Sequence, residues 1–98
     1  MRHEFDFEFE WDEAKAAANW AKHGIAFVKA VALFSAVFIE VDATRLQDGE
    51  ARRKAIGPIE GRLFTVVFTQ RLGNVRVISA RRSNPQEAKQ YANRQVSS

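Results

Sequence analysis

The chain has no cysteine among its 98 residues. This absence excludes disulfide bonds, thiolate catalysis and cysteine-ligated zinc, and it suits a reducing compartment. No apolar run is long enough to span a bilayer, and the N-terminus lacks the basic and then apolar pattern of a signal peptide. We therefore expect a cytoplasmic protein, and the length predicts a single domain over residues 1–98.

Histidine is also scarce, since the chain has only His3 and His23. The two lie far apart in the sequence and offer no ligand spacing, so we expect no metal site and no cofactor. Ser79 and Ser83 have no base in register with them, which argues against a serine hydrolase. The glycines of the second half do not open a helix, so they do not resemble a phosphate-binding loop.

Acidic residues are scarce in the second half of the chain. Residues 1–50 contain ten acids and five bases, a net charge of −5, whereas residues 51–98 contain two acids and ten bases, a net charge of +8. This asymmetry predicts a polyanionic partner, and nucleic acid is the commonest one. The alternative is that the two halves neutralise each other across the fold.

The first half of the chain predicts two strands and two helices. Aromatic and acidic residues alternate over Phe5–Trp11, which indicates a half-buried strand. Asp12 and Gly24 are typical N-terminal and C-terminal caps of a helix. Its alanines at 14, 17, 18 and 21 form a small-residue stripe that we expect to pack against the sheet. A short helix over Phe27–Phe34 and a strand over Val37–Asp42 follow.

The second half predicts three strands and a helix. Strands are expected over Arg52–Ile59, interrupted near Gly57-Pro58 at an edge or bulge, over Leu63–Arg71 and over Val75–Arg82. A loop over residues 72–74 joins the last two. In the last strand, simple alternation predicts one face with Arg76, Ile78, Ala80 and Arg82 and another with Val75, Val77, Ser79 and Arg81.

A capping box predicts where the last helix begins. Asn84 is the cap, Pro85 takes the first helical position and Glu87 lies three residues after the cap. The order of elements predicts an α+β fold: a small antiparallel β-sheet with two helices from the N-terminal half and one C-terminal helix.

Two motifs and one tyrosine carry a resemblance. The first motif is Phe9–Lys15 with Asn19 and Lys22-His23-Gly24, the second is Arg76–Arg82, and Tyr91 follows on the last helix. Together they resemble the BrnT family of ribonuclease toxins, from bacterial type II toxin–antitoxin pairs. The resemblance covers nearly the whole chain. Ala26 and Ala88 depart from it, since the family often has serine or threonine at the first position and a basic residue at the second.

The resemblance implies a RelE-like fold and metal-free cleavage of RNA that inhibits translation and growth. It also implies a BrnA-type antitoxin with a ribbon-helix-helix domain, which neutralises the toxin and forms with it a complex that binds operator DNA.

Arginine suits this chemistry because its planar fork donates hydrogen bonds to phosphate in pairs. The 2′-hydroxyl of RNA attacks the adjacent phosphorus when the geometry is enforced and cations meet the developing charge. We expect catalytic roles for His23, Lys22, Arg52, Arg81 and Tyr91. We expect RNA binding by Arg62, Arg71, Arg76, Arg82 and Lys89.

Several alternatives stay open at this point. His23 can simply be part of a helix cap, and Tyr91 can belong to the core. We expect Arg81 to be an exposed strand residue whose removal leaves the fold intact. Instead of an enzyme, the chain can be a basic module that binds RNA or a protein through the same sheet, or an inactive toxin homologue acting in a repressor complex. A His23 that points away from the arginines favours the binding module.

Overall fold

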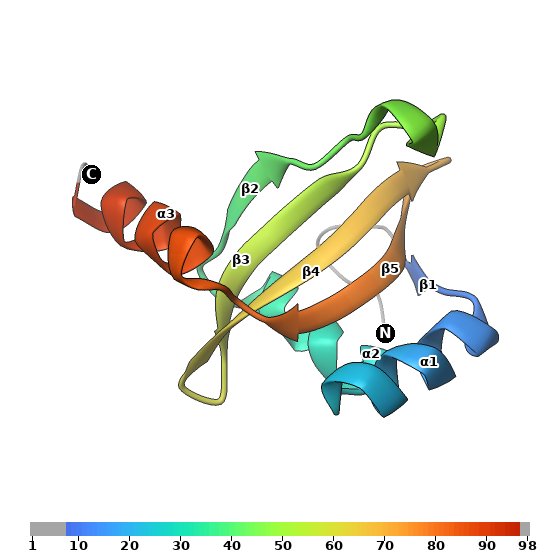
Figure 1. Cartoon of the computed structure of the whole chain (residues 1–98), viewed down its shortest axis with the longest axis horizontal. Helices are drawn as coiled ribbons and strands as arrows, with labels where there is room; N and C mark the ends of the chain where they lie inside the picture. Colours follow the sequence, from blue (N-terminus) through green and yellow to red (C-terminus); the bar gives the residue numbers. More distant parts are fainter. Residues whose placement is uncertain (1–7, 97–98) are drawn as a thin grey trace.

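The computed structural model describes residues 8–96 (Figure 1), so the expectations for His3, Phe5 and Phe7 lie outside the described residues. Its elements in chain order are β1 (Phe9–Glu10), α1 (Glu13–His23), α2 (Phe27–Ala30), the 3-10 helix η1 (Val31–Ser35), β2 (Ile39–Asp42), the 3-10 helix η2 (Leu46–Asp48), β3 (Arg53–Ile59), β4 (Arg62–Arg71), β5 (Asn74–Arg82) and α3 (Pro85–Val96). The predicted α+β class is confirmed.

The five strands form one sheet in the order β1-β5-β4-β3-β2. β1 runs parallel to β5, and all other neighbours are antiparallel. The two hairpins turn on Glu60-Gly61 and Leu72-Gly73, whose φ angles are all positive, as two-residue hairpin turns require. The second loop is shorter than predicted because Asn74 already pairs with Arg71.

β3 is not interrupted at Gly57-Pro58, contrary to the prediction. Pro58 pairs with Leu63 of β4 but lies beyond the last pair between β2 and β3, which joins Ile39 to Ile56. The proline therefore sits where β3 is locally an edge strand, and its missing N–H does not break a ladder on that side. A Cβ on Gly57 would lie 2.9 Å from the Cβ of Phe38, so only glycine allows this close approach.

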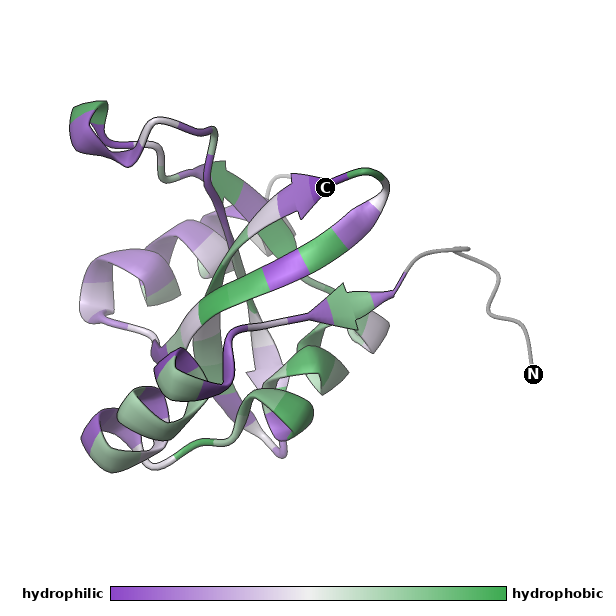
Figure 2. Ribbon diagram, turned by 90° about the vertical axis from the view of Figure 1, so that its right-hand side faces the viewer, coloured by the Kyte–Doolittle hydropathy of each residue, from purple (hydrophilic) through white to green (hydrophobic). Residues whose placement is uncertain are grey.

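A β-bulge changes the faces of β5. Val67 is opposite Ser79, but the next residue, Phe68, is opposite Val77, so Ile78 has no partner in β4. Alternation therefore shifts by one residue, and the predicted grouping of β5 side chains is wrong. Up to the bulge, polar and apolar residues alternate along β5 (Figure 2). After it, Arg81 lies on the same face as Arg76, although the two are five positions apart, an odd number that would put them on opposite faces of a regular strand.

The sheet has two different faces. The core face packs against α1, α2 and η1, and its buried strand residues include Ala55, Val66, Phe68, Val75, Val77 and Ala80. The α3 face carries the residues that alternate with these, including Lys54, Thr65, Val67, Thr69, Ser79 and Arg81. Helices α1 and α2 gather beside β5, whereas α3 lies near β2 and β3 (Figure 1). The α3 face is thus only partly covered.

Helix α1 has the predicted caps but a different buried face. The N–H of Lys15 donates to Asp12 Oδ1 at 3.0 Å, and Gly24 ends the helix with φ of 70°. The alanine stripe at 14, 17, 18 and 21 is exposed, so the prediction that it packs against the sheet is wrong. Ala16 and Asn19 face the core instead.

Asn19 explains this orientation. Its Nδ2 donates to the carbonyls of Ala80, at 2.9 Å, and Ile25, at 3.2 Å, and its Oδ1 accepts from the N–H of Ala80 at 3.1 Å. Within the described part of the chain, β1 pairs with two residues of β5, Val75 and Arg76. The buried carboxamide therefore satisfies the edge of β5 where no strand does, which makes Asn19 an architectural residue.

Candidate active site on the α3 face

A hollow of about 600 Å³ opens on the part of the α3 face that α3 leaves uncovered. It lies between β5, β4, β3 and the connection from β2 to β3. Its lining residues are Ala43, Thr44, Arg45, Arg52, Lys54, Val67, Ile78, Ser79 and Arg81. Four cations, two hydroxyls and a small apolar surface therefore meet in one concave place. Among the predicted site residues, the hollow brings together Arg52 and Arg81.

The buried carboxylate of Glu87 binds two of these cations, Arg81 and Lys54. Its side chain is 1% exposed, and its carboxylate accepts from Arg81 Nη1 and Nη2, both at 2.7 Å, and from Lys54 Nζ at 2.9 Å. Thr65 Oγ1 and the N–H of Asn84 also donate to Oε1, each at 2.9 Å. One buried carboxylate thus fixes a guanidinium and an ammonium side by side on the wall of the hollow.

These contacts change the ionisation of the pair. Burial acts to raise the pKa of Glu87, but the hydrogen bonds from Arg81, Asn84, Lys54 and Thr65 outweigh it and hold that pKa well below its usual range. The hydrogen bonds that Arg81 donates to Glu87 in turn raise the pKa of Arg81. The expectation that Arg81 is a free, exposed strand arginine is wrong, since it is half-buried in this ion pair.

The predicted capping box is present and forms part of the same network. The N–H of Glu87 donates to Asn84 Oδ1 at 2.8 Å, and Glu87 Oε1 accepts from the N–H of Asn84. The residue that begins α3 is therefore also the residue that positions Arg81 and Lys54. The sequence predicted the first role from local spacing, whereas the second required the fold.

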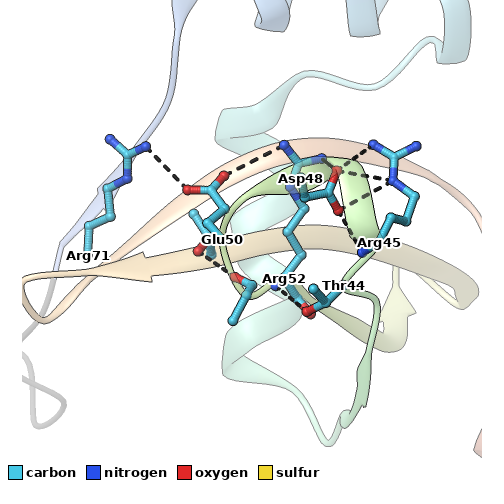
Figure 3. Close-up of polar contacts among 8 residues, drawn as sticks. Thr44, Arg45, Asp48, Glu50, Arg52 and Arg71 are labelled. Carbon is cyan, nitrogen blue, oxygen red and sulfur yellow. Dashed lines mark hydrogen bonds and ion pairs between the residues drawn. The ribbon is translucent and has the colours of Figure 1, made fainter.

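Arg52 lies at the centre of a row of alternating charges (Figure 3). The ion pairs of the row are Arg71–Glu50 at 3.3 Å, Arg52–Glu50 at 3.6 Å, Arg52–Asp48 at 3.5 Å and Arg45–Asp48 at 2.9 Å. The N–H of Arg52 also donates to Thr44 Oγ1 at 2.8 Å. The hydrogen bond from Arg45 lowers the pKa of Asp48. The row fixes Arg52 and Arg45 at the edge of the hollow.

The structure does not bring the other predicted catalytic residues to the hollow. Lys22 and His23 end α1, and neither residue lines the hollow. Tyr91 is buried, and its hydroxyl donates to the carbonyl of Val37 at 2.7 Å, which ties α3 to the segment before β2.

The predicted RNA-binding residues are spread over several surfaces. Arg76 lies on the α3 face, near the edge, and pairs with Glu10 at 3.1 Å. Arg71 ends β4 and belongs to the row of charges. Arg82 lies over the ring of Phe64, and Arg62 begins β4 beside the β3–β4 turn. Lys89 is exposed on α3. These residues do not form one continuous patch with the hollow.

Sequence reasoning gave no role to Lys54 or Arg45. Lys54 was visible as one of the basic residues of β3, but only its pairing with Val67 places it on the same face as Arg81. The sequence contains one further indication of the role of Glu87, since it is one of just two acidic residues among residues 51–98. A lone acid among many bases is a good candidate for a buried ion pair.

Two features are absent from the described residues 8–96. No helix there combines the length and hydrophobicity that crossing a membrane requires. No group of three or more histidine, aspartate or glutamate side chains in that range lies close enough together to hold a metal ion.

Comparisons with known proteins agree on one family. The profile described as "Ribonuclease toxin, BrnT, of type II toxin-antitoxin system" matches residues 11–87. Among solved structures, the chain is similar to the 1.1 Å crystal structure of the Brucella abortus ribonuclease toxin BrnT, with 29% sequence identity, a TM-score of 0.60 and coverage of 80% of this chain and 97% of that one. No curated protein sequence matches the chain. Because the profile spans well over half of its residues, the chain belongs to the BrnT family of type II toxin–antitoxin ribonuclease toxins.

Proposed function

We propose that this chain is a ribonuclease toxin that cleaves RNA at the hollow on the α3 face, without a metal ion. The observation that carries the proposal is the placement of Arg81 and Lys54 by the buried carboxylate of Glu87. A guanidinium has five N–H donors, and Arg81 gives two to Glu87 and one to the carbonyl of Arg82. The remaining donors are available to a phosphate.

The chemistry follows from this placement. The 2′-hydroxyl oxygen attacks the adjacent phosphorus, the bond from phosphorus to the 5′ oxygen breaks, and a 2′,3′-cyclic phosphate forms. Arg81 and Arg52 stabilise the charge on the phosphorane oxygens. Lys54 donates a proton to the departing 5′ oxygen, and the proton of the 2′-hydroxyl passes to water. Val67 and Ile78 offer an apolar surface for a base, with the hydroxyls of Thr44 and Ser79 beside it.

One observation favours a second candidate, a basic module that binds RNA without cutting it. His23 does not line the hollow, and the hydroxyl of Tyr91 donates to a backbone carbonyl. Among residues 8–96, no imidazole lines the hollow to move protons, so proton transfer to the leaving group depends on Lys54. An inactive homologue that serves only in a repressor complex would share this property.

The proposal extends to the partner and the compartment. The family to which the chain belongs consists of toxins of type II systems, in which an antitoxin protein neutralises the toxin. We propose a BrnA-type antitoxin with a ribbon-helix-helix domain, a joint complex on operator DNA, a cytoplasmic location and a RelE-like relationship of the fold. An open hollow with this charge would otherwise bind RNA with little sequence preference.

Adjacent residues of β3 provide a matched test of the site. Lys54 faces the hollow, whereas Arg53 pairs with Glu40 at 3.2 Å on the other face. We expect Lys54→Gln to slow RNA cleavage by the purified chain at least tenfold, and Arg53→Gln to leave the rate unchanged. Arg81→Lys keeps the positive charge but loses the planar guanidinium that donates hydrogen bonds in pairs, so it should also slow cleavage.

Several outcomes would redirect the proposal. RNA that is bound but never cut by the folded wild-type chain would establish the binding module instead. Equal rates for Lys54→Gln and Arg53→Gln would remove the hollow from the mechanism. If His23→Gln slows cleavage while Lys54→Gln does not, the chemistry takes place at the end of α1.

A further inference from the structure

Two leucines stand fully in solvent at loop tips. Leu46 begins η2 and Leu72 opens the β4–β5 turn, and both side chains are completely exposed. Leu72 also has φ of 52°, a conformation that favours asparagine, aspartate or glycine at this turn position. A leucine at position 72 is unfavourable because its apolar side chain is exposed to water and because its positive φ is strained. It contributes nothing to the hydrophobic core. The fold alone does not explain this residue.

The two loop tips belong to the same end of the sheet. Thr69 Oγ1 donates to the carbonyl of Ala51 at 2.7 Å, and Arg71 pairs with Glu50, so the end of β4 is fixed against the η2 segment. The row of charges runs from Arg71, which precedes Leu72, to Arg45, which precedes Leu46 (Figure 3). We call Leu46, Leu72 and this row the leucine ridge.

In the leucine ridge, the arginine side chains at the two ends are more exposed to solvent than the carboxylates with which they pair. The side chains of Arg45 and Arg71 are 61% and 54% exposed, whereas those of Asp48 and Glu50 are 2% and 30% exposed. The carboxylates therefore lie beneath the guanidinium groups that they hold in place. A matching partner surface would bring apolar side chains for the leucines and carboxylates for the arginines.

We propose that the leucine ridge is a docking site for a protein segment that is amphipathic and acidic, contributed by the antitoxin. The inference rests on the proposed function for the identity of this partner. RNA is the less suitable occupant, because the two fully exposed leucine side chains offer nothing to phosphate. Arg45 belongs to the ridge and also lines the hollow. A protein seated on the ridge therefore covers the entrance to the hollow, and blocks RNA without contacting Arg81.

The test uses the full chain and its cognate antitoxin, both purified. In the double variant, Leu46 is replaced by serine and Leu72 by asparagine. Leu72→Asn suits the positive φ, so it should not unfold the turn. The control is Val28→Ser, on α2, since Val28 is also exposed, at 69%, but lies away from the ridge. We expect the double variant to bind the antitoxin at least tenfold more weakly, the control to bind as wild type does, and both to cleave RNA at the wild-type rate.

The outcomes separate the two proposals. Wild-type affinity of the double variant for the antitoxin overturns the docking site, whatever the ribonuclease assay shows. A loss of RNA binding by the double variant, with antitoxin binding intact, also overturns it and assigns the ridge to RNA. If the wild-type chain cuts no RNA but the leucine substitutions still weaken antitoxin binding, the ribonuclease proposal fails and the docking site stands.

Discussion

Replacing Glu87 with glutamine should destabilise the protein far more than an ordinary surface substitution. Oε2 of Glu87 accepts from Arg81 Nη2 and Lys54 Nζ, while Oε1 accepts from Arg81 Nη1, Thr65 and the N–H of Asn84. The side-chain oxygen of a glutamine can still accept from Arg81 Nη1, Thr65 and the N–H of Asn84. Its amide nitrogen then lies against Arg81 Nη2 and Lys54 Nζ, which are both hydrogen-bond donors. The variant therefore loses two charge-assisted hydrogen bonds and the charge that holds two cations together.

Each such bond contributes about 1.5 to 3 kcal/mol to stability. The side chains of Arg81 and Lys54 remain 30% and 22% exposed, so water recovers part of the loss and the lower end of that range applies. We expect Glu87→Gln to lower the free energy of unfolding by about 3 kcal/mol. The control is Glu40→Gln, which breaks the exposed pair with Arg53 and should cost under about 0.5 kcal/mol.

The difference between wild type and Glu87→Gln should depend on pH in one direction. The folded state lowers the pKa of Glu87, so its contribution is complete above the unfolded pKa of about 4.3 and is lost as pH falls toward the folded pKa. Glutamine does not titrate. The stability difference should therefore be constant between about pH 6 and 8 and shrink below about pH 4.3.

Urea denaturation followed by circular dichroism measures both effects. With a slope of roughly 1.5 kcal/mol per molar urea for a chain of this size, 3 kcal/mol corresponds to a fall of about 2 M in the midpoint. The reasoning is refuted if Glu87→Gln and Glu40→Gln have the same midpoint at pH 7. It is also refuted if the difference grows as the solution is made acidic.

Two further predictions concern the edge of the sheet and the chemistry. Asn19→Ala leaves the N–H and carbonyl of Ala80 and the carbonyl of Ile25 without their partner, so it should cost about 2–4 kcal/mol of unfolding free energy; a cost below 1 kcal/mol would show that β5 needs no such cap. RNA cleavage by the purified chain should continue at the same rate in EDTA, and activity that EDTA abolishes and magnesium restores would contradict the metal-free mechanism.

The sequence by itself determined the local structure well. Asp12, Gly24 and the Asn84–Glu87 pair begin or end helices where they were predicted to, because a cap acts through hydrogen bonds to residues three or four positions away. The strands β3, β4 and β5 were also predicted, since their apolar and polar residues show the pattern of a sheet. β4, whose nearly continuous hydrophobic run is typical of a buried strand, lies at the centre of the sheet.

Only the tertiary structure decided which side chains meet. The bulge at Ile78 moves Arg81 to the other face of β5, and no local pattern announces it, because a bulge depends on the register between two strands. Likewise, Asn19 rather than the alanine stripe faces the sheet, because the backbone of β5 there has no neighbouring strand to satisfy it. Register and edge pairing thus bring Lys54 and Arg81, from different strands, to the carboxylate of Glu87.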